Sequence, residues 1–242
     1  MTNRTKWSAQ LFTVLLCALA LKYFYSTTGP DDLRWILGPV TWLTSLLSGR
    51  SFSFEGHSGY MSSDHTFLIA ASCAGVNFLI TSFLLLAVKQ LWTNRKTKLS
   101  WWFIPRAAFF AYLTTLVANT VRICIALELQ RHPVQSDWLN ANQIHRLEGI
   151  IVYFGFLFFL HLVTEGERMS VKYMLLPLAI YYFTTLGLPL MNGAYRRGGE
   201  FWEHAAFVVL IPLVLIIPVL LFRVFSVSQR LSTLCIKKLR FS

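Results

Sequence analysis

Long apolar stretches alternate with short polar ones along almost the whole chain. Six of them are long enough to cross a bilayer, which takes about 20 apolar residues in a helix. These predicted spans are residues 7–25, 66–88, 101–128, 144–163, 173–191 and 204–225. No repeat or soluble domain interrupts the series. The pattern predicts an all-α fold, a polytopic membrane helix bundle that occupies residues 1–242 as a single domain.

A seventh apolar stretch, residues 33–47, is shorter and contains Gly38 and Pro39. It predicts an interfacial or re-entrant helix, with a spanning helix as the alternative. The distribution of basic residues favours the interfacial or re-entrant helix. With the N-terminus inside, six spans leave thirteen basic residues on the inside and five in outside loops, and a spanning 33–47 helix would disrupt this bias. Because basic residues mark cytoplasmic loops, both termini are predicted to be cytoplasmic.

Composition agrees with a membrane class. The chain is 55% hydrophobic and only 14% charged, whereas soluble domains carry about 25% charged residues. This excludes a disordered chain, a disulfide-stapled secreted scaffold and an ordinary soluble enzyme. The net charge of +11 does not indicate nucleic-acid binding, because the basic residues lie at the ends of apolar segments. The composition therefore predicts that the protein is embedded in a lipid bilayer.

The first span has two interpretations. Arg4 and Lys6 precede an apolar run that contains Ala18-Leu19-Ala20, as in a signal peptide with a cleavage site. The run continues to Tyr25 and is long enough to span, so we expect it to be retained. Cleavage would leave the later topology unchanged.

Polar residues inside spans are costly and therefore mark functional candidates. In the second span Cys73 is predicted about 10 Å below the outer end, with Asn77 on the same helix face. A buried thiol is commonly a small core residue. The small and polar neighbours Ser72 and Gly75 favour a site instead.

The third and fourth spans carry further polar groups. Thr115, Asn119 and Arg122 form a stripe at helical spacing, which favours an arginine facing the bundle over one that extends to the membrane surface. His145 and Glu148 share a face, and Glu148 needs a proton or a cation such as Arg122. An ion-pair role and a catalytic role for Glu148 both stay open, and His145 is also compatible with a solvated helix end.

Three of these residues are predicted at one membrane depth. Cys73, Arg122 and His145 lie on consecutive spans of alternating direction, yet all three fall in the outer third. Cys124, rotated about 200° from Arg122 on an ideal helix, is expected to point elsewhere. The four cysteines include no Cys-x-x-Cys, and the chain lacks His-Glu-x-x-His, Gly-x-Ser-x-Gly and a pair of intramembrane aspartates. We therefore predict no metal and no cofactor.

Three short motifs resemble the exosortase/archaeosortase family of membrane-embedded cysteine transpeptidase-like enzymes, and the wording around Cys73 is similar to the exosortase K subgroup. The resemblance covers about residues 65–155. The motifs are Ser72-Cys73-Ala74-Gly75, Asn119-Thr120-Val121-Arg122-Ile123, and His145 followed four residues later by Gly149.

The resemblance implies that Cys73 is the nucleophile, Arg122 the second catalytic residue and His145 the third, with Asn77, Asn119 and Glu148 as supporting residues. Two positions depart from the family pattern. Many members have Ser where this chain has Ala74, and many have an acidic residue where it has Arg146. The second departure removes the acidic residue that would orient His145. Glu148 is predicted to orient His145 instead.

The implied substrate is a secreted protein with a C-terminal sorting signal, which consists of a short motif, one membrane helix and a basic end. Cleavage and transfer would proceed through a Cys73 thioester on the outer face of a bacterial inner membrane. A guanidinium beside the thiol favours the reactive thiolate, and it can also stabilise the tetrahedral oxyanion. His145 would protonate the leaving amine and deprotonate the second nucleophile.

Other functions remain open from the sequence. A small transporter or channel would use Arg122 and Glu148 as an ion site, and in a structural membrane subunit none of these residues would act. Residues 48–63, rich in Ser and Gly, fit either a lid or docking loop or a plain solvated loop.

Overall fold

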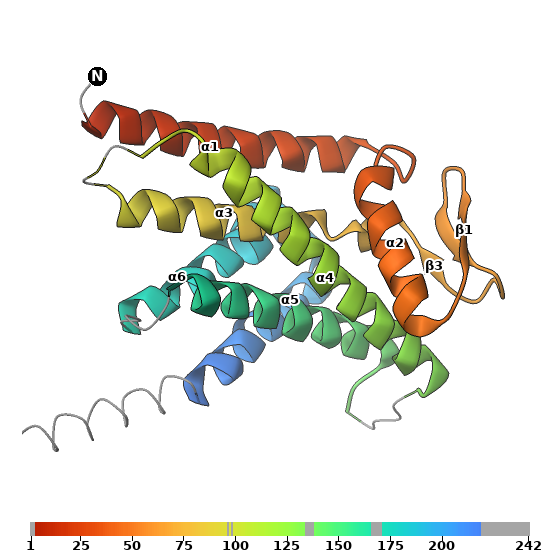
Figure 1. The fold of residues 1–242 in the computed structure, drawn as a ribbon. Coiled ribbons are helices and arrows are strands. Elements are labelled where there is room, and N and C mark those ends of the chain that lie inside the picture. The colour runs from red at the N-terminus through yellow and green to blue at the C-terminus, as the bar shows by residue number, and fades with distance from the viewer. Residues whose placement is uncertain (1–2, 96, 98, 134–137, 166–170, 219–242) are drawn as a thin grey trace, which may run out of the picture.

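The computed structural model describes residues 3–95, 97, 99–133, 138–165 and 171–218. Most of these residues are helical, and the fold is the all-α membrane bundle that the sequence predicts (Figure 1). Five helices are long and apolar enough to cross a membrane. They are Thr5–Thr27, Ala71–Thr93, Phe103–Arg131, Ala141–Thr164 and Gly199–Pro218.

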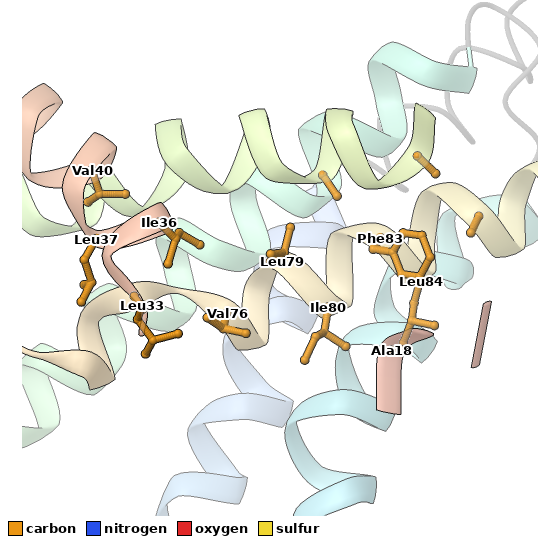
Figure 2. Packing of buried hydrophobic residues seen from close by; sticks show 14 of the residues in the cluster. Ala18, Leu33, Ile36, Leu37, Val40, Val76, Leu79, Ile80, Phe83 and Leu84 are labelled. Carbon is orange, nitrogen blue, oxygen red and sulfur yellow. The ribbon is translucent and has the colours of Figure 1, made fainter. Parts of the chain in front are cut away.

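Helix α3 (Val76–Thr93) lies at the centre of the bundle. It packs against α1 (Asn3–Thr27), α4 (Phe103–Arg131), α5 (Ala141–Glu165) and α6 (Val171–Tyr182). Figure 2 shows the apolar side chains on α3 that form this core, with Ala18 of α1 beside them. Because apolar residues surround α3 on every side, the helix is apolar all round rather than striped, as a buried membrane helix should be.

The start of the second predicted span is wrong. Leu68–Ile69 form strand β3, Ala71–Ala74 form a 3-10 turn (η1), and α3 begins only at Val76. The intervening Gly75 has a φ of 72°, in the left-handed region, which ends the turn before α3 begins. Cys73 and Asn77 therefore do not share one helix face, and Cys73 lies at the start of α3 rather than about 10 Å along it.

Helix α2 (Arg34–Ser48) is the seventh apolar stretch. Its 15 residues give a length of about 22 Å, short of the roughly 30 Å of bilayer core. The helix lies across the end of the bundle, at a steep angle to α1 and α3 (Figure 1). Its buried face, which includes Ile36, Leu37 and Val40, joins the apolar cluster of α3 and α4 (Figure 2). Length and packing both fit the interfacial helix and not a span.

The segment after α2 is an ordered hairpin. Strands β1 (Phe52–Glu55) and β2 (Gly59–Ser62) pair antiparallel, and β3 adds to β2, giving the order β1-β2-β3. Tyr60 lies opposite Phe54 on one side and Ile69 on the other. The sheet thus ties the loop after α2 to the turn that contains Cys73.

The fifth predicted span, residues 173–191, is helical but is not a regular α-helix throughout. Helix α6 continues through a π-helical turn (Phe183–Gly187) into α7 (Leu188–Met191). Pro189 lacks an amide hydrogen, which removes a helical hydrogen bond at this turn. The apolar part, Leu175–Met191, is shorter than the five long helices. The last predicted span is helical from Gly199 to Pro218, and the predicted cytoplasmic tail, with Cys235, lies outside the described residues.

The eight tryptophans fall into two groups at the two ends of the bundle. Interfacial tryptophans commonly form such belts at the two membrane surfaces. Trp7 belongs with the end of α3, because its Nε1 donates to the carbonyl of Leu91 at 3.2 Å. Trp92 near the end of α3 and Trp101 and Trp102 just before α4 belong to the same group as Trp7. The other group is Trp35 and Trp42 of α2, Trp138 just before α5, and Trp202 near the start of the helix Gly199–Pro218. Cys73, Arg122 and His145 lie toward the second group.

Candidate active site

The turn that holds Cys73 is fixed by contacts with α4. The Cys73 amide donates to the carbonyl of Ala70 at 2.9 Å, and the Asn119 side-chain amide donates to the carbonyl of Cys73 at 2.5 Å. A Cβ on Gly75 would lie 3.1 Å from Asn119 Cγ. Only glycine suits this position, because it needs both a positive φ and a close approach to α4. The Cys73-Ala74-Gly75 pattern therefore reflects a turn pressed against Asn119.

Arg122 extends from α4 toward α5. Its Nη1 donates to the hydroxyl of Tyr153 at 3.3 Å, and its Nη2 lies 3.2 Å from His145 Nε2. A Cβ on Gly149 would lie 3.4 Å from Arg122 Nε, in ordinary van der Waals contact, so the guanidinium packs directly on this position of α5. The guanidinium therefore points into the bundle, toward Tyr153 and His145 of α5. The spacing of His145 and Gly149 is thus explained by one side chain, that of Arg122.

His145 is held between Arg122 and Glu148. Its Nδ1 lies 3.2 Å from Glu148 Oε2. Because a guanidinium can only donate, His145 Nε2 accepts from Arg122, and the ring proton belongs on Nδ1, facing Glu148. The Glu148 side chain is only 5% exposed, whereas that of His145 is 55% exposed. The buried Glu148 side chain therefore lies where it could orient His145, the role that the sequence predicts for it in place of residue 146.

Tyr153 completes the set and is absent from the sequence-based prediction. Its hydroxyl donates to Asn119 Oδ1 at 2.8 Å while accepting from Arg122, and its ring stacks on Phe78. The signal was present in the sequence, because His145, Gly149 and Tyr153 follow one another at intervals of four, on one face of a helix.

The contacts form a continuous series from Glu148 through His145, Arg122 and Tyr153 to Asn119, which bonds the backbone of Cys73. The Cys73 side chain is half-buried and interacts electrostatically with Arg122 and Tyr153. The three residues predicted as catalytic thus meet at one end of the bundle.

The other predicted residues are placed differently. Asn77 accepts a hydrogen bond from Lys22 Nζ at 2.7 Å, which joins α1 to the start of α3. Lys22 and Tyr25 of α1 therefore belong to the site as well, although no spacing in the sequence links them to it. Cys124 lines a separate groove beside Leu47 of α2, away from Cys73, as its rotation predicted.

A cavity of about 300 Å³ opens beside this network, between α3, α5, the π-helical turn and the helix Gly199–Pro218. Thr184 and Thr185 of the π-helical turn reach it, and Thr81 of α3 donates to Thr184 Oγ1 at 2.9 Å. Among the described residues, its lining contains no carboxylate. Its polar and ionisable groups include Lys22, Ser72, Asn77, Arg122, His145, Arg146, Tyr153 and His204.

Within the part of the chain that the structure describes, no group of three His, Cys, Asp or Glu side chains could hold a metal ion. Comparisons with protein-family models, curated proteins and solved structures found no match. The chemistry of the site is therefore argued from its own geometry and from the sequence motifs.

Proposed function

We propose that this membrane protein is a cysteine protease and transpeptidase-like enzyme that cleaves secreted proteins at a C-terminal sorting signal and transfers them. The observation that carries the proposal is one continuous series of contacts. Glu148 lies within ion-pair distance of His145, and hydrogen bonds lead from His145 through Arg122, Tyr153 and Asn119 to the turn of Cys73. Arg122 and His145 line the cavity together with Ser72 and Gly75, which flank Cys73 in the sequence motif. A thiol, a guanidinium and an imidazole are the groups that acyl transfer through a thioester requires.

Two positively polarised groups lie near the turn of Cys73. The thiol precedes the 18-residue helix α3, whose N-terminus has no side-chain cap. A helix N-terminus and a nearby guanidinium both stabilise a thiolate. We expect the same two groups, the first amides of α3 and Arg122, to donate hydrogen bonds to the tetrahedral oxyanion.

The reaction then follows in two steps. Cys73 gives its proton to Nε2 of His145, once that nitrogen is released from Arg122, and the thiolate attacks the carbonyl carbon of the scissile peptide bond. The C–N bond then breaks, and the leaving amine takes that proton from His145 Nε2. The product is a thioester on Cys73. An incoming nucleophile, water or an amine, loses its proton to His145 and attacks the thioester, which releases the thiolate. Glu148 keeps the imidazole oriented in both steps.

The substrate class rests on the motif resemblance and on the position of the site. Cys73 lies at the level of one tryptophan belt, so a substrate helix that crossed the bilayer beside the bundle would present its end to the cavity. The charge bias of the loops assigns this belt to the outer face. A protein anchored by one C-terminal helix in a bacterial inner membrane is therefore cut at the outer surface, where its folded part lies.

A test of the nucleophile needs no knowledge of the substrate. Cys73 should react with a small water-soluble iodoacetamide faster than Cys124, which lies outside the network, and replacing Arg122 with Met should slow only Cys73. Arg122→Lys should restore part of the rate, because it keeps the charge but not the fork of donors. Equal rates for Cys73 in the wild type and Arg122→Met would contradict the proposal.

A further inference from the structure

A second cavity lies at the opposite end of the bundle from Cys73. It occupies about 600 Å³ between α3, α4 and α5. Lys89 near the end of α3, Arg106 in the first turn of α4 and Thr164 near the end of α5 all line it. This is the end that carries Trp92 and Trp101, so the cavity lies at the level of a membrane surface.

The cavity wall has two chemically different parts. Polar groups of Gln90, Thr93 and Asn94 accompany the two cations, whereas the other side is apolar. Among the described residues the lining has no carboxylate. The apolar side consists of Leu86, Ala107, Phe110, Leu160 and Val163.

Lys89 is held in place rather than extended into solvent. Its Nζ donates to Thr164 Oγ1 at 2.8 Å and to the carbonyl of His161 at 3.4 Å, so it connects α3 to α5. Arg106 projects from α4 and is exposed. A hydrogen-bonded cation and an exposed one, supplied by different helices, face the same cavity. Basic residues that only marked the cytoplasmic side would have no reason to converge in this way.

We propose that this cavity binds one anionic phospholipid, with its phosphate between Lys89 and Arg106 and an acyl chain against Phe110, Leu160 and Val163. Basic pockets between membrane helices at the surface bind anionic head groups, and here an apolar wall continues from the cations. A free phosphate would leave that wall uncovered, and the basic end of a peptide would be repelled by the two cations. The site shares no residue with the network around Cys73.

Native mass spectrometry of the full-length protein tests this site. Protein purified in detergent is mixed with equal amounts of phosphatidylglycerol and phosphatidylethanolamine, and the lipid retained by each species is identified. The wild type should retain one phosphatidylglycerol in preference to phosphatidylethanolamine. Arg106→Gln should lower this preference about fivefold, the factor expected for one cation beside a phosphate.

Arg95→Gln is the matched control. Arg95 is exposed at the same end of the bundle, lies over the Trp92 ring and does not line this cavity. It should retain the wild-type preference. Thr93→Glu provides a second variant that removes no side-chain hydrogen bond of Lys89, and its carboxylate should repel the phosphate and lower retention of phosphatidylglycerol.

Several outcomes would overturn the site. The first is a wild type that shows no preference between the two lipids. The second is Arg106→Gln and Thr93→Glu variants that retain the wild-type preference. Equal loss in Arg95→Gln would indicate general attraction of anionic lipid, and displacement of the lipid by inorganic phosphate alone would indicate a phosphate site. The alkylation rate of Cys73 in the same samples should be unchanged in Arg106→Gln, so this proposal and the proposed function can fail separately.

Discussion

At the scale of single residues, two glycines set the geometry of the site. Gly75 has a positive φ and lies against Asn119, and Gly149 packs against Arg122. Each glycine therefore acts through a neighbouring polar side chain. Their effects should be separable from a general loss of helix stability.

Gly75→Ala should destabilise the protein and reduce processing. The left-handed backbone costs a non-glycine residue about 1–2 kcal/mol, and the added Cβ would press on Asn119. Gly155→Ala on α5 is the control, because nothing lies within 4 Å of its added Cβ. Thermal unfolding in detergent measures both. A melting temperature for Gly75→Ala equal to that of Gly155→Ala would contradict the account of the turn.

Tyr153→Phe should reduce processing of the substrate by roughly 10- to 100-fold. The change keeps the stack on Phe78 but removes the hydroxyl that joins Arg122 to Asn119, and a buried polar group left without its partner costs roughly 1–3 kcal/mol. Tyr182→Phe removes a hydroxyl that bonds the carbonyl of Val209, outside the network, and should have little effect. Similar activities for the two variants would remove Tyr153 from the site.

Much of the site could be predicted at this scale, because polar residues inside apolar spans are few and their spacing is informative. Cys73, Arg122, His145 and Glu148 were all found in this way. Tyr153 was missed because an aromatic residue in a membrane helix carries no polar signal by itself. Lys22 was missed because its contact with Asn77 joins elements 55 residues apart, and no local spacing reveals such a contact.

At the scale of elements, the hairpin is the part that hydropathy did not predict. Four-residue strands carry too short an alternation to be recognised, and the apolar residues of β3 merged with those of α3 into one apparent span. The position of Cys73 depends on this difference. Because β3 pairs with β2, the chain reaches α3 through a turn rather than along a continuous helix.

The turn after β2 should show an unusually acidic carboxyl group. Hydrogen bonds from Ser62 and Thr66 lower the pKa of Asp64 to about 2, and Arg50 lies 3.6 Å away. Because this pKa is below its ordinary value, the contacts stabilise the turn fully above about pH 4. Their contribution is lost as the pH falls through about 2. An NMR titration in detergent micelles measures the midpoint, and Ser62→Ala should raise it. A titration midpoint near pH 4 for Asp64 in the wild type would contradict these hydrogen bonds.

At the scale of the whole molecule, the charge bias of the loops predicts one orientation. The hairpin should be outside and the end of α3 inside. In a background without native cysteines, a membrane-impermeant thiol reagent should label a cysteine at Ser58 in intact cells and should not label one at Arg95. Both should react after the membrane is permeabilised. Labelling at Arg95 in intact cells would reverse the orientation and place the site on the cytoplasmic face.

The most direct test of the central claim is C-terminal peptide mass spectrometry of membrane and released proteins from cells that carry the wild type, Cys73→Ala or Cys124→Ala. We expect particular proteins to keep a C-terminal membrane helix in Cys73→Ala alone, because only that variant lacks the nucleophile. Matching profiles in all three, with each protein expressed, would contradict the claim. Loss of ion flux in Glu148→Gln, with normal flux in Cys73→Ala, would then identify a transporter.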